Sequence, residues 1–352
     1  MARRSMVLAV ALLVSVGVAV LLPWGVSGSV GPLSAQGEGT PLAFGRPLLP
    51  QSAVARPGPT IVPPPSSSGF IPPPMDLSHL RGDRMPAGVS ALSLQPRWDW
   101  REAGKVSPVG NQGTCGACYA FAAIGNVESK LLIDGAGTWD FSENHAKECN
   151  WPEMNPSSGS PWDGLGSCNG GNYFMLATLF STKGVVLDSC DPYVAQDVQC
   201  KTDCAYQKTL LDWRLLNGRA VPDTSVLKGY IQSYGPIETG VYAGDGDAWA
   251  NELGRYDGSY TLYHTGTERA NHRVLIIGWD DNLSHQGGKG GWIVKNSWST
   301  DWGGTCGYGT ERGFFTIAYG SANIGSCHFS WIPWYHYDPT GTVVSLTYDC
   351  LT

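Results

Sequence analysis

The chain has 352 residues, of which 42% are hydrophobic and 15% are charged, and its formal net charge is −7. A chain of this length and hydrophobic content can bury a large core, so a wholly disordered protein is excluded. The negative charge is spread without acidic or basic blocks, so we do not expect nucleic acid as a partner.

The N-terminus combines a basic tip with an uninterrupted apolar run over residues 6–26, followed by small residues. This order is typical of an export signal, which we predict over residues 1–28. The apolar run is also long enough to span a bilayer, so an uncleaved membrane anchor is the alternative. We therefore expect a secreted protein, or one that is tethered to a membrane and faces outside.

Residues 29–93 are rich in Pro, Gly and Ser and include the stretch IVPPPSSSGFIPPPM. This composition predicts an extended pro-segment or linker that has no packed core of its own. The triplet RGD at Arg81–Asp83 lies within this segment, and we interpret it as a coincidence in a loop.

Aromatic residues return near Leu94, where the globular part is predicted to begin. The run YAFAAIGNVESKLLID after Cys118 predicts a mostly buried helix that Gly135 ends, and a second helix is predicted around residues 174–180. Beyond Pro236, the runs IETGVYA, RVLIIGW, GGWIVKNSW and GFFTIAYG predict strands. A helical first half and a β-rich second half together predict an α+β fold with two parts.

Two further segments, residues 150–166 and 281–291, contain many Gly, Ser, Asn and Asp residues. We predict that both are long surface loops.

Cys115 and Cys118 stand three residues apart in NQGTCGACYAF. No second CxxC and no Cys/His cluster at ligand spacing accompanies them, which argues against zinc. A thioredoxin-type pair would need a parallel βαβ context, which the late strands do not supply. The remaining interpretation places Cys118 at the first turn of a helix, where backbone amides and the helix dipole lower a thiol pKa and favour a nucleophile.

A nucleophilic thiolate needs a base and a group that orients the base. His272 stands at the beginning of one predicted strand, and Asn296 at the end of the next. These two residues are our candidates. Asp163, Asp245 and Asp247 lie in predicted loops without the spacing of a calcium-binding loop, so we expect no metal.

All ten cysteines lie between Cys115 and Cys350, which is typical of an oxidising compartment in which most are paired. If one is a free nucleophile, nine remain. The odd number predicts a second free thiol or an unpaired partner.

Several separate motifs occur in one order: WDWREAGKVSPVGNQGTCGACYAF, SENHAKEC, CNGG, GPIETGVY, NHRVLIIGW, KNSWSTDWGGTCGYG and GSCHFSW. In these motifs the chain resembles the papain family of cysteine peptidases, from Pro96 to about Trp331, and CGACY matches that family's signature around the nucleophile. The resemblance implies a helical left domain and a β-barrel-like right domain with the active-site cleft between them. The implied peptidase domain covers residues 94–335.

Within that domain we expect the left part over about residues 94–206 and the right part over about residues 207–335. Residues 336–352 would then form a C-terminal extension.

The resemblance also implies a catalytic role for four residues. Cys118 would be the nucleophile, and His272 would be the general base that later protonates the leaving amine. Asn296 would orient the imidazole. The side chain of Gln112 and the backbone N–H of Cys118 would hold the negative charge of the tetrahedral intermediate.

Four further residues are implied in substrate binding. Gly170 and Gly171 would let a substrate strand approach and pair with their backbone groups. Trp298 would shield the bond between Asn296 and the catalytic histidine from water. Arg273 stands where the family usually has a small residue, at the floor of the main specificity pocket. A cation there would favour acidic or polar side chains, or would simply narrow the pocket.

The disulfides Cys115–Cys168 and Cys149–Cys200 are also implied by the resemblance. Cys190 and Cys204 are a plausible local pair. Cys306 could pair with either of the last two cysteines, Cys327 and Cys350.

The implied function is that of a secreted cysteine endopeptidase, a monomer that acts on proteins or peptides without a cofactor. We expect the loop over residues 150–166 to border the cleft and restrict its substrates. The Pro-rich segment differs from the family's usual long, charged, helical pro-domain, and it could cross the cleft as an extended strand or serve as a surface tether. Two alternatives keep the fold: an acyl transferase or ligase with the same thiol chemistry, and a non-catalytic surface binding module.

Overall fold

The computed structural model describes residues 69–71, 85–150, 166–217 and 221–330, all of which belong to one compact unit, residues 56–352. The predicted export signal, most of the Pro-rich segment, residues 151–165 of the predicted cleft loop and the predicted C-terminal extension lie outside the described residues. Among the described helices, none is long and apolar enough to cross a membrane.

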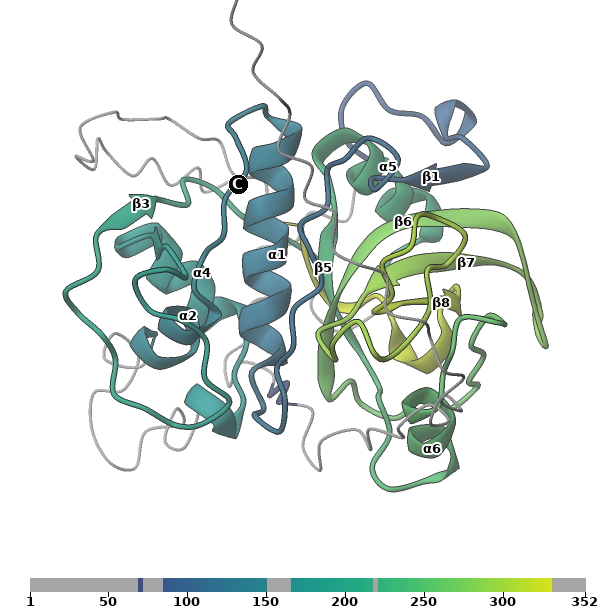
Figure 1. Ribbon diagram of the computed structural model, residues 1–352. Helices are drawn as coiled ribbons and strands as arrows, with labels where there is room; N and C mark the ends of the chain where they lie inside the picture. Colours follow the sequence, from purple (N-terminus) through teal and green to yellow (C-terminus); the bar gives the residue numbers. More distant parts are fainter. Residues whose placement is uncertain (1–68, 72–84, 151–165, 218–220, 331–352) are drawn as a thin grey trace, which may run out of the picture. The chain divides into compact units, whose positions relative to one another are not determined.

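The helical part is organised around one long helix, α1 (Cys118–Ile133), against which α2 (Glu143–Cys149) and α4 (Tyr173–Thr182) pack (Figure 1). Most residues of α1 are buried, because helices cover one of its sides and strand β6 (His272–His285) covers another. Gly125 permits this close approach, since a Cβ there would lie 3.3 Å from Nζ of Lys295. The helix ends before Gly135, which has a φ of 71°, as the sequence predicted.

The two shorter helices begin at polar N-cap residues. The side chain of Ser142 accepts a hydrogen bond from the backbone N–H of His145 in α2, and that of Asn172 accepts from Phe174 and Met175 in α4. A small antiparallel sheet of β2 (Val185–Val186) and β3 (Tyr206–Lys208) completes this part, with the 3₁₀ helix η3 (Ser167–Asn169).

The second part of the chain forms a seven-stranded antiparallel sheet. Its strands are β1 (Arg97–Asp99), β4 (Arg214–Asn217), β5 (Ile237–Val241), β6, β7 (Gly288–Lys295), β8 (Phe314–Ala318) and β9 (Ser326–Ser330), in the order β4-β9-β5-β6-β7-β8 with β1 paired to β6. Helices α5 (Thr224–Tyr234) and α6 (Ala248–Gly254) and the 3₁₀ helices η2 (Ala91–Ser93) and η4 (Ser321–Asn323) accompany the sheet. The α+β prediction is therefore confirmed.

The prediction of a long loop over residues 281–291 is wrong. Strands β6 and β7 continue through this segment as a hairpin, in which Ser284 pairs with Lys289 and His285 with Gly288. The turn of the hairpin consists of Gln286 and Gly287, and the other glycines of this segment, Gly288, Gly290 and Gly291, lie within β7. The alternation of exposed and half-buried residues in the outer part of the hairpin gives no hydrophobic signal that the sequence could reveal.

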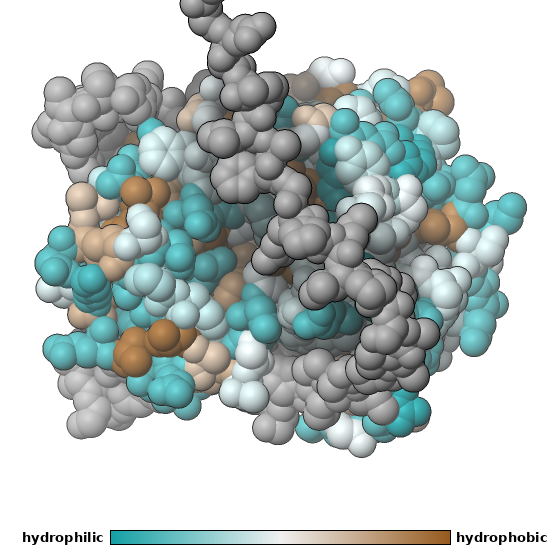
Figure 2. Space-filling model, in the orientation of Figure 1, coloured by the Kyte–Doolittle hydropathy of each residue, from teal (hydrophilic) through white to brown (hydrophobic). Residues whose placement is uncertain are grey.

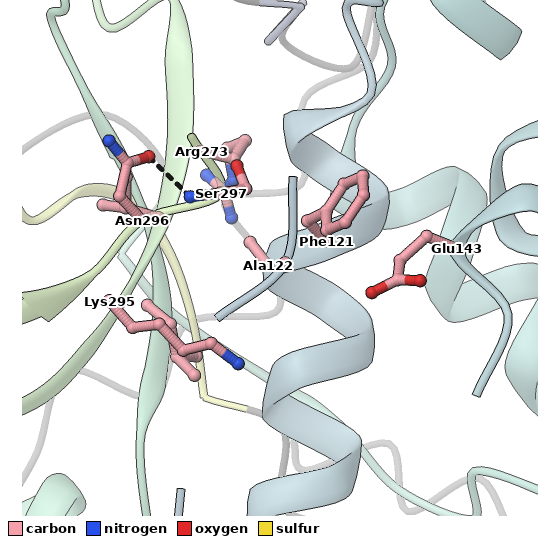
Figure 3. Close-up of a pocket in the computed structure, with 10 residues that line it drawn as sticks. Phe121, Ala122, Glu143, Arg273, Lys295, Asn296 and Ser297 are labelled. Carbon is pink, nitrogen blue, oxygen red and sulfur yellow. Dashed lines mark hydrogen bonds between the residues drawn. The ribbon is translucent and has the colours of Figure 1, made fainter. Parts of the chain in front are cut away.

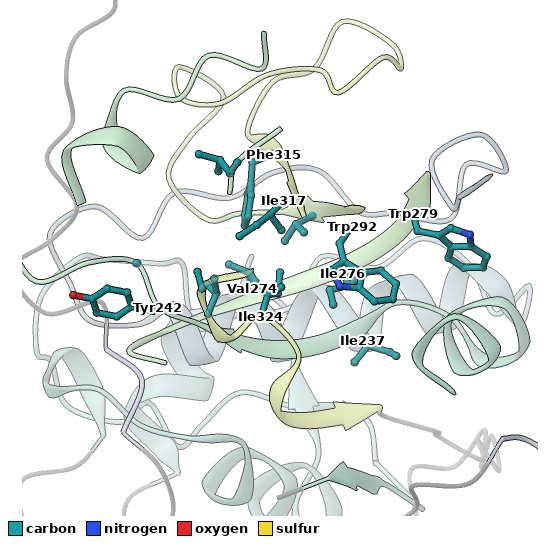
Figure 4. Close-up of a cluster of buried hydrophobic side chains, with 14 of the residues drawn as sticks. Ile237, Tyr242, Val274, Ile276, Trp279, Trp292, Phe315, Ile317 and Ile324 are labelled. Atoms are coloured by element: carbon teal, nitrogen blue, oxygen red, sulfur yellow. The ribbon is translucent and has the colours of Figure 1, made fainter. Parts of the chain in front are cut away.

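The described residues contain three hydrophobic clusters. The largest lies against the sheet and includes Ile237, Ile276, Trp279, Trp292 and Phe315, all at most 1% exposed (Figure 4). The second surrounds α1 and α4, and the third is a small group of residues from β6, β7 and β8. The face visible in Figure 2 is mostly hydrophilic, with its hydrophobic residues in separate small patches, as expected when the apolar side chains are used for these cores.

Three disulfides connect the loops of the helical part: Cys115–Cys168, Cys149–Cys200 and Cys190–Cys204. The first two are the pairs that the resemblance implied. Among the described cysteines, Cys118 and Cys306 form no disulfide with one another or with the rest. The side chain of Cys327 and all of Cys350 lie outside the described residues, so the pairing predicted for Cys306 stays a prediction.

Candidate active site

The sulfur of Cys118 lies at the point where the helical part meets the sheet. Cys118 is the first residue of α1, and no acidic residue occupies the first turn of that helix. The backbone N–H of Arg273, the second residue of β6, hydrogen-bonds to the Cys118 sulfur. The residue next to His272 therefore contacts the thiol, and the fold brings together Cys118 and Arg273, which are 155 positions apart (273 minus 118).

His272 and Asn296 meet across strands β6 and β7. The distance between Nε2 of His272 and Oδ1 of Asn296 is 2.8 Å. The same Oδ1 accepts from the backbone N–H of Ser297 at 2.8 Å (Figure 3). Because a backbone N–H can only donate, this atom of Asn296 is the amide oxygen, and a hydrogen bond to it requires that Nε2 of His272 carry a proton. The bond fixes both the orientation and the tautomer of the imidazole.

Trp298 covers this pair. Its ring lies 4.8 Å from the imidazole of His272, centroid to centroid, at an interplanar angle of 30°. Trp302 packs edge-on against the other side of Trp298 at 5.0 Å. The three residues His272, Asn296 and Trp298 are each at most 4% exposed, so the hydrogen bond lies in a place from which water is largely excluded.

Gln112 is fully buried and firmly held beside the thiol's helix. Its Nε2 donates to the carbonyl of Cys115 at 2.9 Å, and its Oε1 accepts from the hydroxyl of Ser297 at 2.7 Å. The backbone N–H of Gln112 in turn donates to the carbonyl of Ser297. Gln112 therefore connects the loop before α1 to the residue after Asn296.

A short piece of the Pro-rich segment, the strap Gly69–Ile71, lies against Gly171. The N–H of Gly171 donates to the carbonyl of Gly69 at 2.8 Å, and the N–H of Ile71 donates to the carbonyl of Gly171 at 3.1 Å. Phe70 thus pairs with Gly171 in parallel register. The sequence allowed for an extended strand of this segment at the cleft, and Phe70 makes the bridge of such a strand with Gly171, although Gly69 has a φ of 89°.

Neither Gly170 nor Gly171 could carry a side chain in this structure. A Cβ on Gly170 would lie 2.6 Å from the carbonyl oxygen of Gly69, and one on Gly171 would lie 2.7 Å from the ring of Tyr119. Gly170 also has a φ of 94°, which favours glycine. A backbone strand can lie along this edge because no side chain occupies it.

Arg273 is fully buried and forms an ion pair with Glu238 of β5. Its Nε lies 2.9 Å, and its Nη2 lies 2.8 Å, from Oε1 of Glu238, which is equally buried. The guanidinium also lies over the ring of Phe70, 4.8 Å from its centroid. Glu238 thus balances the charge of Arg273. The preference for acidic or polar side chains, and its alternative of a narrowed pocket, stay predictions.

The thiol of Cys118 is fully buried, and Cys118 and Phe70 belong to the same hydrophobic cluster. Burial raises the pKa of Cys118 to about 12, and hydrogen bonds from the backbone of Arg273 and Tyr119, with the charge of Arg273, oppose this rise only in part. We expected the helix start to lower this pKa. In the covered cleft, the loss of solvation outweighs the helix amides.

A polar pocket lies behind the site, between α1 and β7, lined by Glu143, Arg273, Lys295 and Asn296 among others (Figure 3). Nζ of Lys295 donates to Ser107 at 3.0 Å. Burial raises the pKa of Glu128, which faces the same lysine, to about 7.

One group of described residues has the composition of a metal site: His145, Cys149 and Cys200 lie close together. The two sulfurs are joined in a disulfide, so neither is available as a thiolate ligand. The arrangement is therefore a histidine packed beside a disulfide.

The model of a known family, the papain family of cysteine proteases, matches residues 94–331. The chain belongs to this family. Among curated relatives, it is 29% identical over 268 residues to the viral cathepsin of Heliothis zea nuclear polyhedrosis virus, which covers 74% of this chain and 62% of that protein. It is also 29% identical to cysteine proteinase 1 of Dictyostelium discoideum, over 67% of this chain and 64% of that protein.

A cathepsin L-like proteinase of Fasciola hepatica is 30% identical, over 70% of this chain and 67% of that protein. The chain thus spans less than two thirds of the length of the viral and Dictyostelium relatives. Among solved structures, procathepsin L2 proteinase from the larval midgut of Tenebrio molitor matches with a TM-score of 0.59 and 27% identity, over 77% of this chain and 79% of that chain.

A structure from a study of the mite allergens Blo t 1 and Der p 1 matches with a TM-score of 0.58 and 22% identity, over 74% of this chain and 79% of that chain. At this identity the match concerns the fold alone.

The sequence missed Glu238 and Phe70 among the residues around the thiol. Glu238 lies in the predicted strand IETGVYA, where a single carboxylate in an apolar run was a signal of a buried partner. Phe70 is the one aromatic residue in IVPPPSSSGFIPPPM.

Proposed function

We propose that this chain is a cysteine endopeptidase that hydrolyses peptide bonds through Cys118, His272 and Asn296. The observation that carries the proposal is the bond from Nε2 of His272 to Oδ1 of Asn296. His272 begins strand β6, and the next residue of that strand, Arg273, contacts the Cys118 sulfur. This arrangement holds an oriented base beside a thiol at a helix start. Family membership supports the same chemistry.

In the proposed reaction, the imidazole of His272 takes the thiol proton at Nδ1, and the Cys118 sulfur attacks the substrate carbonyl carbon. The resulting oxyanion accepts hydrogen bonds from Nε2 of Gln112 and the backbone N–H of Cys118. The intermediate expels the amine, to which His272 returns the proton, and a thioester remains. Water then attacks the thioester, with His272 again taking and returning a proton, and the acid product leaves.

Asn296 acts in this scheme by keeping Nε2 protonated, so that Nδ1 is the basic nitrogen. The cover of Trp298 strengthens that bond by excluding water. Gly170 and Gly171 would pair with the substrate backbone, as they do with the strap.

We also propose that the substrates are proteins or peptides and that the enzyme works outside the cytoplasm. Support comes from the three disulfides, which persist in oxidising compartments, and from the export-type N-terminus.

The direct test is labelling with a thiol-directed epoxide, followed by mapping of the modified peptide, together with turnover of a denatured protein substrate. We expect stoichiometric label on Cys118 and none in Cys118→Ala, which should also lose turnover. Cys306→Ala is the matched control, since Cys306 is the other cysteine without a disulfide in the described part of the chain, and it should keep both label and turnover. Labelling confined to other cysteines, with no turnover, would reject the proposal.

A further inference from the structure

The strap indicates which side chain fits the pocket beside the thiol. Backbone pairing with Gly171 fixes the position of Phe70, whose side chain is 5% exposed. A substrate strand that pairs with the same glycine would direct one side chain into the same space. Phe70 therefore marks the position of a substrate side chain. The family resemblance implies that this is the side chain two residues before the cleaved bond.

The floor of this pocket is a buried guanidinium. The plane of Arg273 contacts two aromatic rings, Phe70 at 4.8 Å and Tyr173 at 5.4 Å from the ring centroids. Arg273 is fully buried, and a guanidinium that has lost its water attracts a ring face more strongly than an exposed one. An aliphatic side chain in the same space would fill volume without this attraction.

The charge of that floor is balanced from the neighbouring strand. Oε1 of Glu238 accepts a hydrogen bond from Nε of Arg273 and lies 2.8 Å from Nη2, and both side chains are fully buried. In the β5–β6 register, Gly240 lies opposite Arg273 and Glu238 is two residues away. A substrate carboxylate entering the pocket would lose its own solvation and meet a carboxylate already bound to the guanidinium.

We propose that the Arg273–Glu238 pair is the specificity determinant of the pocket: a flat, neutral floor that selects an aromatic side chain over aliphatic and acidic ones. The predicted selection among substrates rests on the proposed function. The packing of Phe70 on Arg273 does not depend on catalysis, so the pocket and the proposed function can be tested separately.

The first experiment compares cleavage of peptides with Phe, Leu or Glu two residues before the cut, by the wild type, Glu238→Gln and the double variant Arg273→Met/Glu238→Met. We expect the wild type to cut the Phe peptide at least about fivefold faster than the Leu peptide, and to cut the Glu peptide slowest. Glu238→Gln leaves a net positive charge, so the rate for the Glu peptide should rise. The double variant removes both charges together, and its Phe-to-Leu ratio should fall towards one.

A wild type that prefers Leu or Glu over Phe would overturn the proposal. So would a double variant that folds, as judged by far-UV circular dichroism, and keeps the full Phe-to-Leu ratio.

The second experiment needs no catalysis. In the full chain, we measure the rate at which iodoacetamide alkylates Cys118, with Phe70 changed in turn to Leu, Glu and Tyr. Phe70→Leu and Phe70→Glu should uncover the thiol and raise the rate severalfold, whereas Phe70→Tyr should not. In the double variant, Phe70→Leu should make little difference.

These results separate the two proposals. If Cys118 is alkylated at the same rate in the wild type and in Phe70→Leu, the Arg273–Glu238 pair does not select an aromatic side chain, and the inference fails. If the Phe70 series behaves as expected but neither epoxide labelling nor turnover occurs, the proposed function fails and the inference about the pocket stands.

Discussion

At the scale of single residues, the state of the Cys118 thiol follows from what covers it. A helix start, a neighbouring guanidinium and two backbone N–H groups all favour the thiolate, yet burial raises the pKa to about 12. Each of these groups stabilises the thiolate by only a fraction of the solvation free energy that the thiolate loses when it is fully buried. The same sulfur should therefore become acidic once water and substrate replace the strap.

The pH dependence of alkylation tests this argument. A thiol with a raised pKa stays protonated until the pH approaches that value, so Cys118 of the intact chain should react slowly at pH 8 and faster towards pH 11. Phe70→Gly should shift the midpoint of the rate profile downwards by more than one pH unit. An unchanged midpoint would mean that the strap does not cause the burial. Mass spectrometry of the Cys118 peptide separates its reaction from that of Cys306.

Asn296 provides a second prediction at this scale. Asn296→Ala removes the acceptor for Nε2 of His272 and should lower kcat by about two orders of magnitude with little change in KM, because the imidazole loses its orientation rather than the substrate its binding site. Steady-state kinetics on a peptide substrate give both constants. Asn323→Ala is the control: Asn323 is half-buried and donates to the carbonyl of Glu268, and its replacement should change neither constant by more than about twofold. A kcat equal to that of the wild type would remove Asn296 from the mechanism.

At the scale of elements, the loop before α1 is fixed by a disulfide and by a backbone bond. Cys115–Cys168 joins this loop to η3, and the N–H of Gly116 donates to the carbonyl of Cys168 at 3.1 Å. The disulfide therefore constrains both the residues before the nucleophile and the residues before Gly170. We expect it to serve position as well as stability.

Removing this disulfide should show both roles. The variant Cys115→Ala/Cys168→Ala removes a disulfide that joins residues 53 positions apart, and it should lower the free energy of unfolding by about 4 kcal/mol. It should also lower kcat/KM. Cys190→Ala/Cys204→Ala opens a closure of 14 residues, should cost about 3 kcal/mol, and should leave kcat/KM nearly unchanged. Denaturant unfolding and peptide kinetics measure the two effects, and equal losses of activity in both variants would deny the positional role.

The sequence predicted the elements that carry periodic apolar patterns, and it predicted the site through local motifs. Cys118, His272 and Asn296 each stand in such a motif, and α1, β6 and β7 follow from theirs. Helices α2, α5 and α6 were not predicted. Helices α2 and α6 are only seven residues long, whereas α5 is amphipathic, and its buried Val226, Leu227, Tyr230 and Ile231 were a signal that we missed. The partner of Arg273 depends on the register of β5 against β6, which no single segment encodes.

At the scale of the whole molecule, the strap connects the Pro-rich segment to the chemistry of the cleft. Its parallel pairing with Gly171 and the burial of Phe70 occupy the edge and the pocket that a substrate would need. The site described here is therefore covered by the chain's own residues. Activity should depend on removing a cover of three residues rather than on rearranging the catalytic groups.

A single methyl group should test this dependence. Gly69 has a φ of 89°, and a Cβ there would clash with the carbonyl oxygen of Gly116, so Gly69→Ala should displace the strap without changing any residue of the peptidase domain. We expect about a tenfold or greater rise both in peptide turnover by the full chain and in alkylation of Cys118, because each needs the same uncovered thiol.

Gly88→Ala is the matched control for that change. Gly88 also has a positive φ, of 79°, and also precedes the peptidase domain, but a Cβ there would meet no atom within 4 Å. It should therefore carry the same backbone strain and leave both rates as they are in the wild type. If Gly69→Ala and Gly88→Ala behave alike, the strap does not restrain the enzyme. If only Gly69→Ala activates, the inhibition resides in the contact between Gly69 and the loop that positions Cys118.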